Sequence, residues 1–183
     1  MATRHHRIAL TEADGGVVFH RLPVAEIADP DFRLLFEWWH GKRGERAMPA
    51  RADLDPSELR QLLHRLLIIE VSHEPPDFRY RLAGSQTYDI HGIELTGRSV
   101  LDIKPQGQGR LLWNDMCEML ERKQPQHVML QFTNQEGHPR SYRVLRLPLS
   151  PDGDTVDQVL VLQDFGVASH ELKDMYRELL HRP

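Results

Sequence analysis

Three strand candidates in the second half of the chain constrain the fold more than any other feature of the sequence. They span residues 127–133, 142–149 and 158–165, and turn-forming residues at 134–137 and 150–154 separate them. The second and third candidates are apolar with little polar interruption, whereas an antiparallel strand usually keeps one polar, solvated face. Both faces of this sheet therefore need cover from helices.

The preceding part of the chain supplies another hairpin and several helices. Residues 66–71 and 78–82 lie on either side of a proline-containing turn, and their patterns predict two paired strands. Short helical pieces broken by glycines follow at 85–103, and a longer helix is expected at 109–122. This order predicts an α+β fold: a five-stranded antiparallel sheet with helices between strands two and three, plus N-terminal and C-terminal helices.

The N-terminal helix carries clear local signals. Asp29 and Pro30 are typical of an N-cap and a first helical position, and Asp55 and Pro56 repeat this pattern before a second, short helix. An apolar stripe at helical spacing follows the first cap. It consists of Phe32, Leu35, Phe36 and Trp39, with Trp38 beside it. We therefore expect the first helix to present one wide apolar face.

These patterns divide the chain into four segments. Residues 1–28 form an N-terminal extension with a short strand candidate at 17–19, and residues 29–65 form an N-terminal helical cap. Residues 66–166 form the core of sheet and helices, and residues 167–183 form an amphipathic C-terminal helix. The two terminal helices are the candidates for covering the second face of the sheet.

Two glycine-containing stretches of the core resemble the PAS domain family. They are Tyr80–Gly84, on the second strand, and Gly92–Ile103, in the helical middle. A third stretch, Met48–Pro56, follows a Trp-containing helix and resembles, more narrowly, a group of short stand-alone bacterial PAS-like proteins. The likeness covers residues 32–166. It departs from the family at residues 85–88, where Ser-Gln-Thr-Tyr replaces the asparagine and alanine of many PAS domains.

The resemblance implies sensing or regulation. PAS domains bind small molecules or cofactors between sheet and helices, dimerise, and pass the change to another domain or partner. The sequence has no recognisable kinase, cyclase or helix-turn-helix output, so such a sensor would signal in trans through a protein partner. By this resemblance, a ligand would lie near Tyr88, His91, Trp113 and Met116.

The identity of any cofactor stays open at this point. A flavin photosensor of this family needs a reactive cysteine within a particular helical motif, and Cys117 lies mid-helix without that motif. His91 lies where haem-binding PAS domains place their axial histidine. It also directly precedes Gly92, so it equally fits the C-terminal end of a helix, where a cation is favoured.

The Trp-containing helix has two compatible interpretations. Its apolar face predicts a homodimer interface, as expected of a PAS-like protein, or it packs on its own sheet. A helix can cover its own sheet and also meet its counterpart in a second copy. The residues assigned to the interface are Phe32, Leu35, Trp38 and Trp39.

Charge and composition exclude several function classes. Lys and Arg number 23 against 27 Asp and Glu, and the net charge of −4 argues against a binder of phosphate backbones. The single cysteine, Cys117, favours a reducing compartment. The longest apolar runs fall far short of the roughly 20 residues that span a bilayer. We therefore expect a cytoplasmic protein with neither nucleic acid nor membrane as partner.

Catalytic and metal-binding patterns are weak. Asp53 and Asp55 could form a carboxylate pair, but a helix cap already explains Asp55. No nucleophile elbow, phosphate-binding glycine loop or metal-type histidine spacing occurs. We expect neither an enzyme nor a metal site. The expected function is a ligand- or partner-sensing module, with a ligand-free interaction module as the alternative and a small-molecule enzyme as a weaker one.

Arginines on the expected strands leave one question open. Guanidinium groups bind anionic ligands through paired hydrogen bonds. Cross-strand ion pairs with acids such as Glu70 or Asp164 would explain the same residues, and we favour that interpretation. The arginines concerned are Arg79, Arg81, Arg140, Arg143 and Arg146.

Overall fold

The computed structural model describes residues 7–8, 17–103, 106–133 and 136–181. Within these residues an antiparallel sheet has the strand order β1-β2-β5-β6-β7-β3-β4. The strands are β1 (Arg7–Ile8), β2 (Val18–Leu22), β3 (Leu66–His73), β4 (Pro76–Ala83), β5 (Gln126–Thr133), β6 (Pro139–Leu149) and β7 (Gln158–Asp164).

Helices of two kinds connect and cover these strands. The α-helices are α1 (Pro30–Arg43), α2 (Ser85–His91), α3 (Gln106–Arg122) and α4 (Ser169–His181). The short 3-10 helices are η2 (Val24–Glu26), η3 (Arg51–Asp53), η4 (Arg60–Arg65), η5 (Val100–Asp102) and η6 (Gly166–Ala168). Among the described residues, no helix combines the length and apolarity needed to cross a bilayer.

Helix α1 begins where its sequence predicts. A carboxylate oxygen of Asp29 accepts hydrogen bonds from the backbone N–H groups of Asp31 and Phe32, at 2.9 and 3.0 Å, and Pro30 is the first helical residue. The helix ends before Gly44, whose φ of 56° is a conformation that glycine adopts readily.

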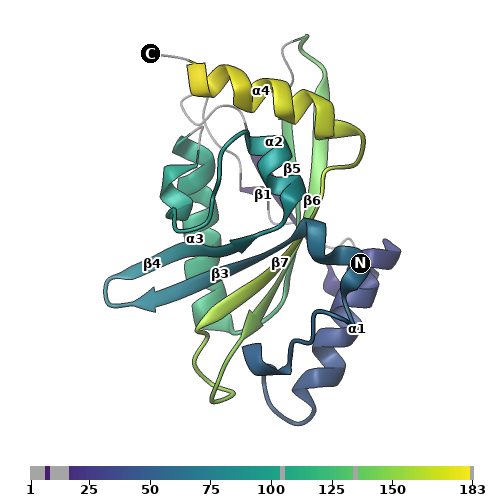
Figure 1. Cartoon of the computed structure of the whole chain (residues 1–183), viewed down its shortest axis with the longest axis vertical. Coiled ribbons are helices and arrows are strands. Elements are labelled where there is room, and N and C mark those ends of the chain that lie inside the picture. The colour runs from purple at the N-terminus through teal and green to yellow at the C-terminus, as the bar shows by residue number, and fades with distance from the viewer. Residues whose placement is uncertain (1–6, 9–16, 104–105, 134–135, 182–183) are drawn as a thin grey trace.

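Helices cover both faces of the sheet, as the apolar strands require (Figure 1). Neighbouring residues of β5 identify the two faces, because successive side chains of a strand point in opposite directions. His127 meets the ring of Phe32 in α1 at 5.6 Å between centroids. The side chain of Gln126 donates to the backbone carbonyl of Asp115 in α3. Helix α1 therefore covers one face and α3 the other, while α4 crosses one end of the molecule next to α2 (Figure 1).

All five predicted strands are present, but the predicted number of strands is too small. Strand β2 pairs with β5 from Val18 opposite Gln131 to Leu22 opposite His127, and the two-residue strand β1 pairs with β2. Only 17–19 stood out in the sequence, because polar residues interrupt the apolar pattern directly afterwards. Residues of the predicted extension thus form part of the sheet.

The short helix predicted after Asp55 is the 3-10 helix η4, but it begins later than predicted, with Leu59 rather than Asp55 at its N-cap. Asp55 accepts a hydrogen bond from the backbone N–H of Ser57 at 2.8 Å. The side chain of Glu58, three residues further on, reaches α1. Its carboxylate accepts from the indole N–H of Trp38 at 2.8 Å and pairs with Lys42 at 2.9 Å, which links this segment to α1.

Candidate functional site: an internal cavity

A small internal cavity lies between the sheet and the helices α2 and α3. Its volume is about 30 Å³, enough for about two water molecules. Most of its wall is apolar and comes from the sheet and from α3. The polar side chains of the wall are Tyr80, His91, Gln108, Tyr142, Arg146 and Gln163.

A chain of alternating charges runs from the cavity wall to the surface. Arg146 on β6 pairs with Asp115 on α3 at 2.6 Å, and each side chain is only 2% exposed. The other carboxylate oxygen of Asp115 binds Arg21 on β2, also at 2.6 Å. Arg21 in turn binds Glu118 at 2.6 Å, and Glu118 binds the exposed Arg122 at 2.9 Å. Three guanidinium groups thus share two carboxylates, with a cation at each end of this charge chain.

Arg146, at the buried end of the charge chain, keeps one donor unused. Its Nη1 donates to Asp115 and, at 3.2 Å, to the side-chain carbonyl of Gln126. Its Nε is buried and has no hydrogen-bond partner among the described residues. The same holds for the side-chain carbonyl oxygen of Gln163. Two residues of the cavity wall therefore have unused capacity to bind a polar ligand.

Two buried tyrosines are joined through Gln108. The side-chain N–H of Gln108 donates to the hydroxyl oxygen of Tyr142 at 2.9 Å, and the hydroxyl of Tyr176 donates to the carbonyl of Gln108 at 3.0 Å. Burial raises the pKa of Tyr142 and of Tyr176, so both hydroxyls stay protonated. Because Tyr176 belongs to α4, these bonds connect the C-terminal helix to the cavity wall.

His91 connects the same helix to the wall from α2. Its ring lies 4.1 Å from the ring of Tyr176, centroid to centroid, and the side chain is buried. Burial lowers the pKa of His91 to about 4, because charging the imidazole there forfeits hydration. His91 is therefore neutral at neutral pH. The turn after it is closed by Gly92 in the left-handed conformation, with φ of 69°.

The lowered pKa of His91 predicts a loss of stability in acid. The unfolded chain binds a proton at this residue near pH 6.5 and the folded chain only near pH 4. The free energy of unfolding therefore falls as the pH drops from about 6.5 towards 4, and His91 alone lowers it by about 2 kcal/mol at pH 5. Urea unfolding should show that the free energy of unfolding falls less between pH 7 and pH 5 in His91→Gln than in the wild type. An exposed-histidine control, His40→Gln, should behave like the wild type; equal losses in all three proteins would contradict the assignment.

The cavity brings together two of the four residues that the sequence assigned to ligand binding. His91 and Met116 lie on its wall. Tyr88 is 54% exposed, and Trp113 packs edge-on against Phe78 at 6.2 Å between ring centroids. Neither of these two lines the cavity. On α3 the wall is formed by positions 108, 112 and 116, so Trp113 is turned about 100° away from it.

Sequence reasoning missed two of the buried polar residues at this cavity, Asp115 and Gln108. Arg146 was named only as one of five arginines that could bind an anionic ligand, an interpretation that the sequence analysis did not favour. The alternation of side chains along β6 could have indicated that Arg146 points into the core, because Tyr142, Val144 and Arg146 share one face of the strand. An arginine on a face otherwise apolar needs a buried acid, and that acid comes from a different element.

Three of the five arginines are ion-paired, and none of these three pairs with the predicted cross-strand acids Glu70 or Asp164. Arg146 pairs with Asp115 of α3, and Arg140 pairs with Glu171 of α4 at 2.7 Å. Arg79 pairs with Asp77 two residues away on its own strand. Helices, rather than neighbouring strands, thus supply the acids for two of the three β6 arginines, Arg140 and Arg146.

The cavity does not fit the large cofactors considered from the sequence. A volume of about 30 Å³ accommodates neither a flavin ring system nor a haem. Cys117 is half-buried on α3 and is not among the wall residues, and burial raises the pKa of its thiol. Among the described residues, no group of three or more His, Cys, Asp or Glu side chains is arranged to hold a metal ion.

An antiparallel sheet that encloses a partly polar cavity beneath short helices has the architecture of a sensory α+β domain. The chain belongs to the PAS domain family, since the model of a family described as PAS domain matches residues 28–163. PAS domains as a class are sensory rather than catalytic. No curated protein matches the chain.

Solved structures with a similar fold include several light-sensing domains. One is titled "Structure of an RNA-binding Light-Oxygen-Voltage Receptor", at 14% identity and a TM-score of 0.45; the match covers 98% of this chain and 43% of that receptor. A PAS domain from Colwellia psychrerythraea matches at 10% identity and a TM-score of 0.42, covering 62% of this chain and 99% of that one. The Rhodobacter sphaeroides LOV protein matches at 15% identity and a TM-score of 0.42, and the match covers 67% of this chain and 74% of that one.

Proposed function

We propose that this protein is a cytoplasmic sensory module that takes a small ligand into the cavity and reports its occupancy through α4 to a protein partner in trans. The observation that carries the proposal is the contact between α4 and the cavity wall. Tyr176 packs on His91 and hydrogen-bonds to Gln108, and both partners line the cavity. A ligand that shifts either wall residue changes the packing of Tyr176, so occupancy and the position of α4 are coupled.

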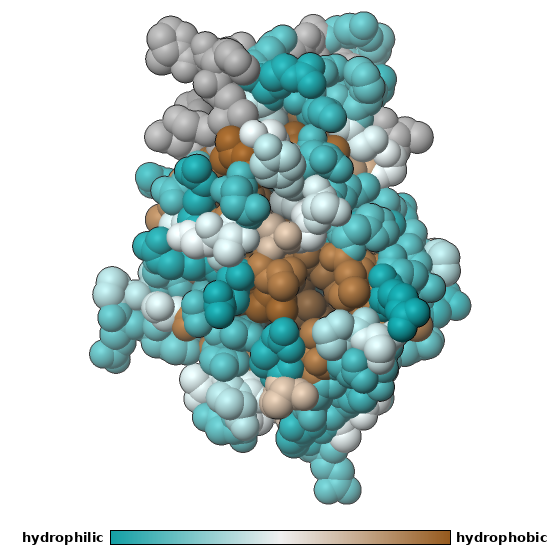
Figure 2. All heavy atoms as spheres, in the orientation of Figure 1, coloured by the Kyte–Doolittle hydropathy of each residue, from teal (hydrophilic) through white to brown (hydrophobic). Residues whose placement is uncertain are grey.

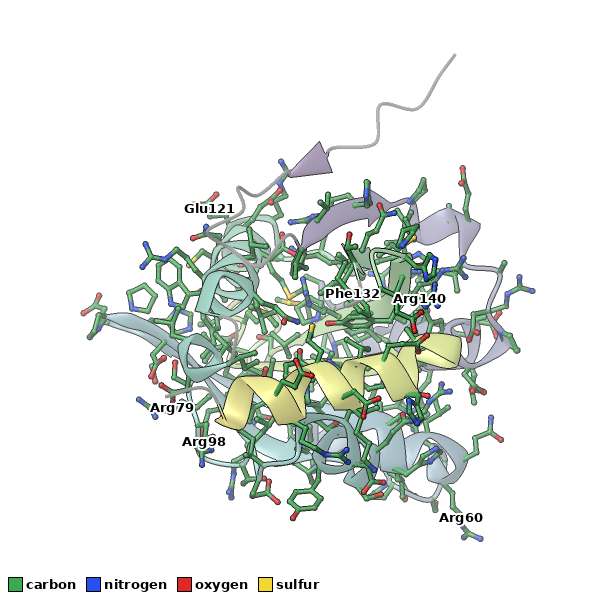
Figure 3. The ribbon with its side chains drawn as sticks, turned by 90° about the horizontal axis from the view of Figure 1, so that it is seen from above. Arg60, Arg79, Arg98, Glu121, Phe132 and Arg140 are labelled. Carbon is green, nitrogen blue, oxygen red and sulfur yellow. The ribbon has the colours of Figure 1, made fainter. Side chains whose placement is uncertain are left out.

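The attachment of α4 suits such a role. Viewed from above, α4 lies across the molecule beside Phe132 of β5 and Arg140 of β6 (Figure 3). Leu172 and Tyr176 are its buried anchors, and the Arg140–Glu171 pair is partly exposed. Among the described side chains of α4, Leu172 and Tyr176 are the ones that are fully buried, and a surface helix anchored in this way is an element that a small ligand can displace.

Replacing Tyr176 with alanine tests the coupling element. The loss of a buried ring should raise amide exchange rates across α4 on the order of tenfold or more. Lys173→Ala, on the exposed side of the same helix, should leave these rates near those of the wild type. Hydrogen exchange with mass spectrometry reads both variants. Equal protection of α4 in Tyr176→Ala and the wild type would contradict the proposed attachment.

Native mass spectrometry of freshly purified protein, followed by denaturing extraction, tests the ligand itself. A reproducible bound small molecule, whose addition to the stripped protein changes exchange in α4, supports the proposal. A bound molecule that leaves exchange in α4 unchanged contradicts it. The same spectra give the oligomeric state and so also test the homodimer.

A ligand-free interaction module is the second candidate function. The small volume of the cavity favours it, and so does a hydrophobic hollow over β3 and β7 in Figure 2. Leu63 and Leu82 are the exposed leucines of this part of the fold, at 39% and 44%. In this candidate the hollow binds a partner or a second copy. Leu82→Glu would then abolish association, whereas a pure ligand sensor would keep its oligomeric state.

A further inference from the structure

We propose that the ligand is a small monocarboxylate, bound by Arg146 through its unused Nε–H. The inference rests on the proposed function, because it names the chemistry of the ligand for the same cavity. It is carried by a charged side chain that is buried, lines the cavity and keeps a free donor.

The charge chain leaves the cavity end positive. Asp115 divides its single negative charge between Arg146 and Arg21, one carboxylate oxygen for each. Glu118 is divided in the same way between Arg21 and Arg122. At the outer end Arg122 is exposed and solvated, whereas Arg146 at the inner end is surrounded by protein. A cation in that position favours an anionic ligand, because water cannot screen the attraction.

The hydrogen-bonding groups of the wall fit a carboxylate. Nε of Arg146 donates to one oxygen in a charge-assisted bond. Gln163 reaches the same space, and its amide can present either the carbonyl or the N–H₂ group by rotation about its last bond. The hydroxyl of Tyr80 stays protonated because burial raises its pKa, so it also remains a donor. No wall residue carries a carboxylate that would repel the ligand.

Size and polarity limit the rest of the ligand. The remainder of the wall is apolar, including Leu112, Met116 and Val161, which suits a hydrocarbon body and not a second charge. A volume of about 30 Å³ restricts the ligand to a few heavy atoms while Tyr176 is in place. A larger body would have to displace wall residues, and two of them, His91 and Gln108, are in contact with Tyr176 of α4, so this displacement is the movement that the sensor is proposed to report.

The experiment compares carboxylates with their neutral amides. The full chain is titrated with acetate, butyrate and benzoate, and in parallel with acetamide, butyramide and benzamide, while NMR follows the methyl resonance of Met116. At least one carboxylate should bind at least about tenfold more tightly than its amide, because a bond to a charged partner is lost in the amide. Arg146→Gln should abolish this preference. Arg143→Gln, on the opposite face of the same strand, should retain it.

Each outcome bears on the proposal. Arg146→Lys keeps the charge without the guanidinium and should retain part of the preference, so it serves if Arg146→Gln fails to fold. Equal binding of carboxylates and amides, or an unchanged preference in Arg146→Gln, overturns the monocarboxylate assignment but leaves a cavity that binds ligand. Failure of every probe to bind overturns the assignment too, and the proposed function then rests on the extracted ligand and on exchange in α4.

Discussion

Replacing Asp115 with alanine is expected to lower the free energy of unfolding by about 3–5 kcal/mol, the usual effect of removing one partner from a buried ion pair. The variant leaves Arg146 buried without its acid, and it also removes one of the two carboxylates that hold Arg21. Urea unfolding followed by tryptophan fluorescence at neutral pH measures the change.

A double variant separates the lost charge from the lost packing. Asp115→Leu combined with Arg146→Met removes both ends of the pair and should recover much of the stability, since no unpaired charge then remains buried. Glu58→Ala, at the exposed pair with Lys42, should change stability little. If Asp115→Ala is as mild as Glu58→Ala, the interior pair is not formed as described.

Replacing Trp39 with alanine is expected to have the second large effect, again lowering the free energy of unfolding by about 3–5 kcal/mol. Trp39 is buried between α1 and the sheet, and its indole N–H donates to the carbonyl of Pro148 at 2.7 Å. The variant leaves a cavity and an unpaired carbonyl, and both destabilise the fold. Thermal and urea unfolding should agree on the loss.

The neighbouring tryptophan supplies the matched control. Trp38 is only half-buried and donates to Glu58 near the surface, so Trp38→Ala should cost clearly less than Trp39→Ala. Phe32 and Leu35 are fully buried in the same chain, so three of the four predicted interface residues, these two and Trp39, are already buried within one copy. A Trp39→Ala protein that kept its stability but changed its oligomeric state would instead place this helix face between two copies.

Local signals predicted much of the fold. The Asp29 cap, Pro30 and the apolar stripe correctly predicted α1 and its buried face, because these signals act within a few residues. Strand β2 was largely missed because Arg21 reads as a surface residue, although it binds Asp115 about ninety residues further along the chain. Strand-like alternation identifies a strand but not the distant acid that lets an arginine point inward.

The site was harder to predict than the fold for the same reason. Family resemblance pointed to the region of His91 and Met116, and both do line the cavity. Resemblance could not determine the rotation of α2 and α3, which turns Tyr88 and Trp113 away from the wall. Those rotations depend on long-range partners, such as the bonds of Tyr176 to Gln108 and of Arg146 to Asp115.

The ion pairs that hold α3 and α4 differ in their access to dissolved salt. Asp115 attaches α3 to β6 through side chains that are 2% exposed, where counterions do not reach. Glu171 attaches α4 to Arg140 through side chains that are 27% and 30% exposed. At physiological ionic strength the screening length is about 8 Å, and it shortens as salt rises. Rising ionic strength should therefore loosen the C-terminal helix while the interior helix keeps its place, so dissolved salt would act on the same element as the proposed ligand.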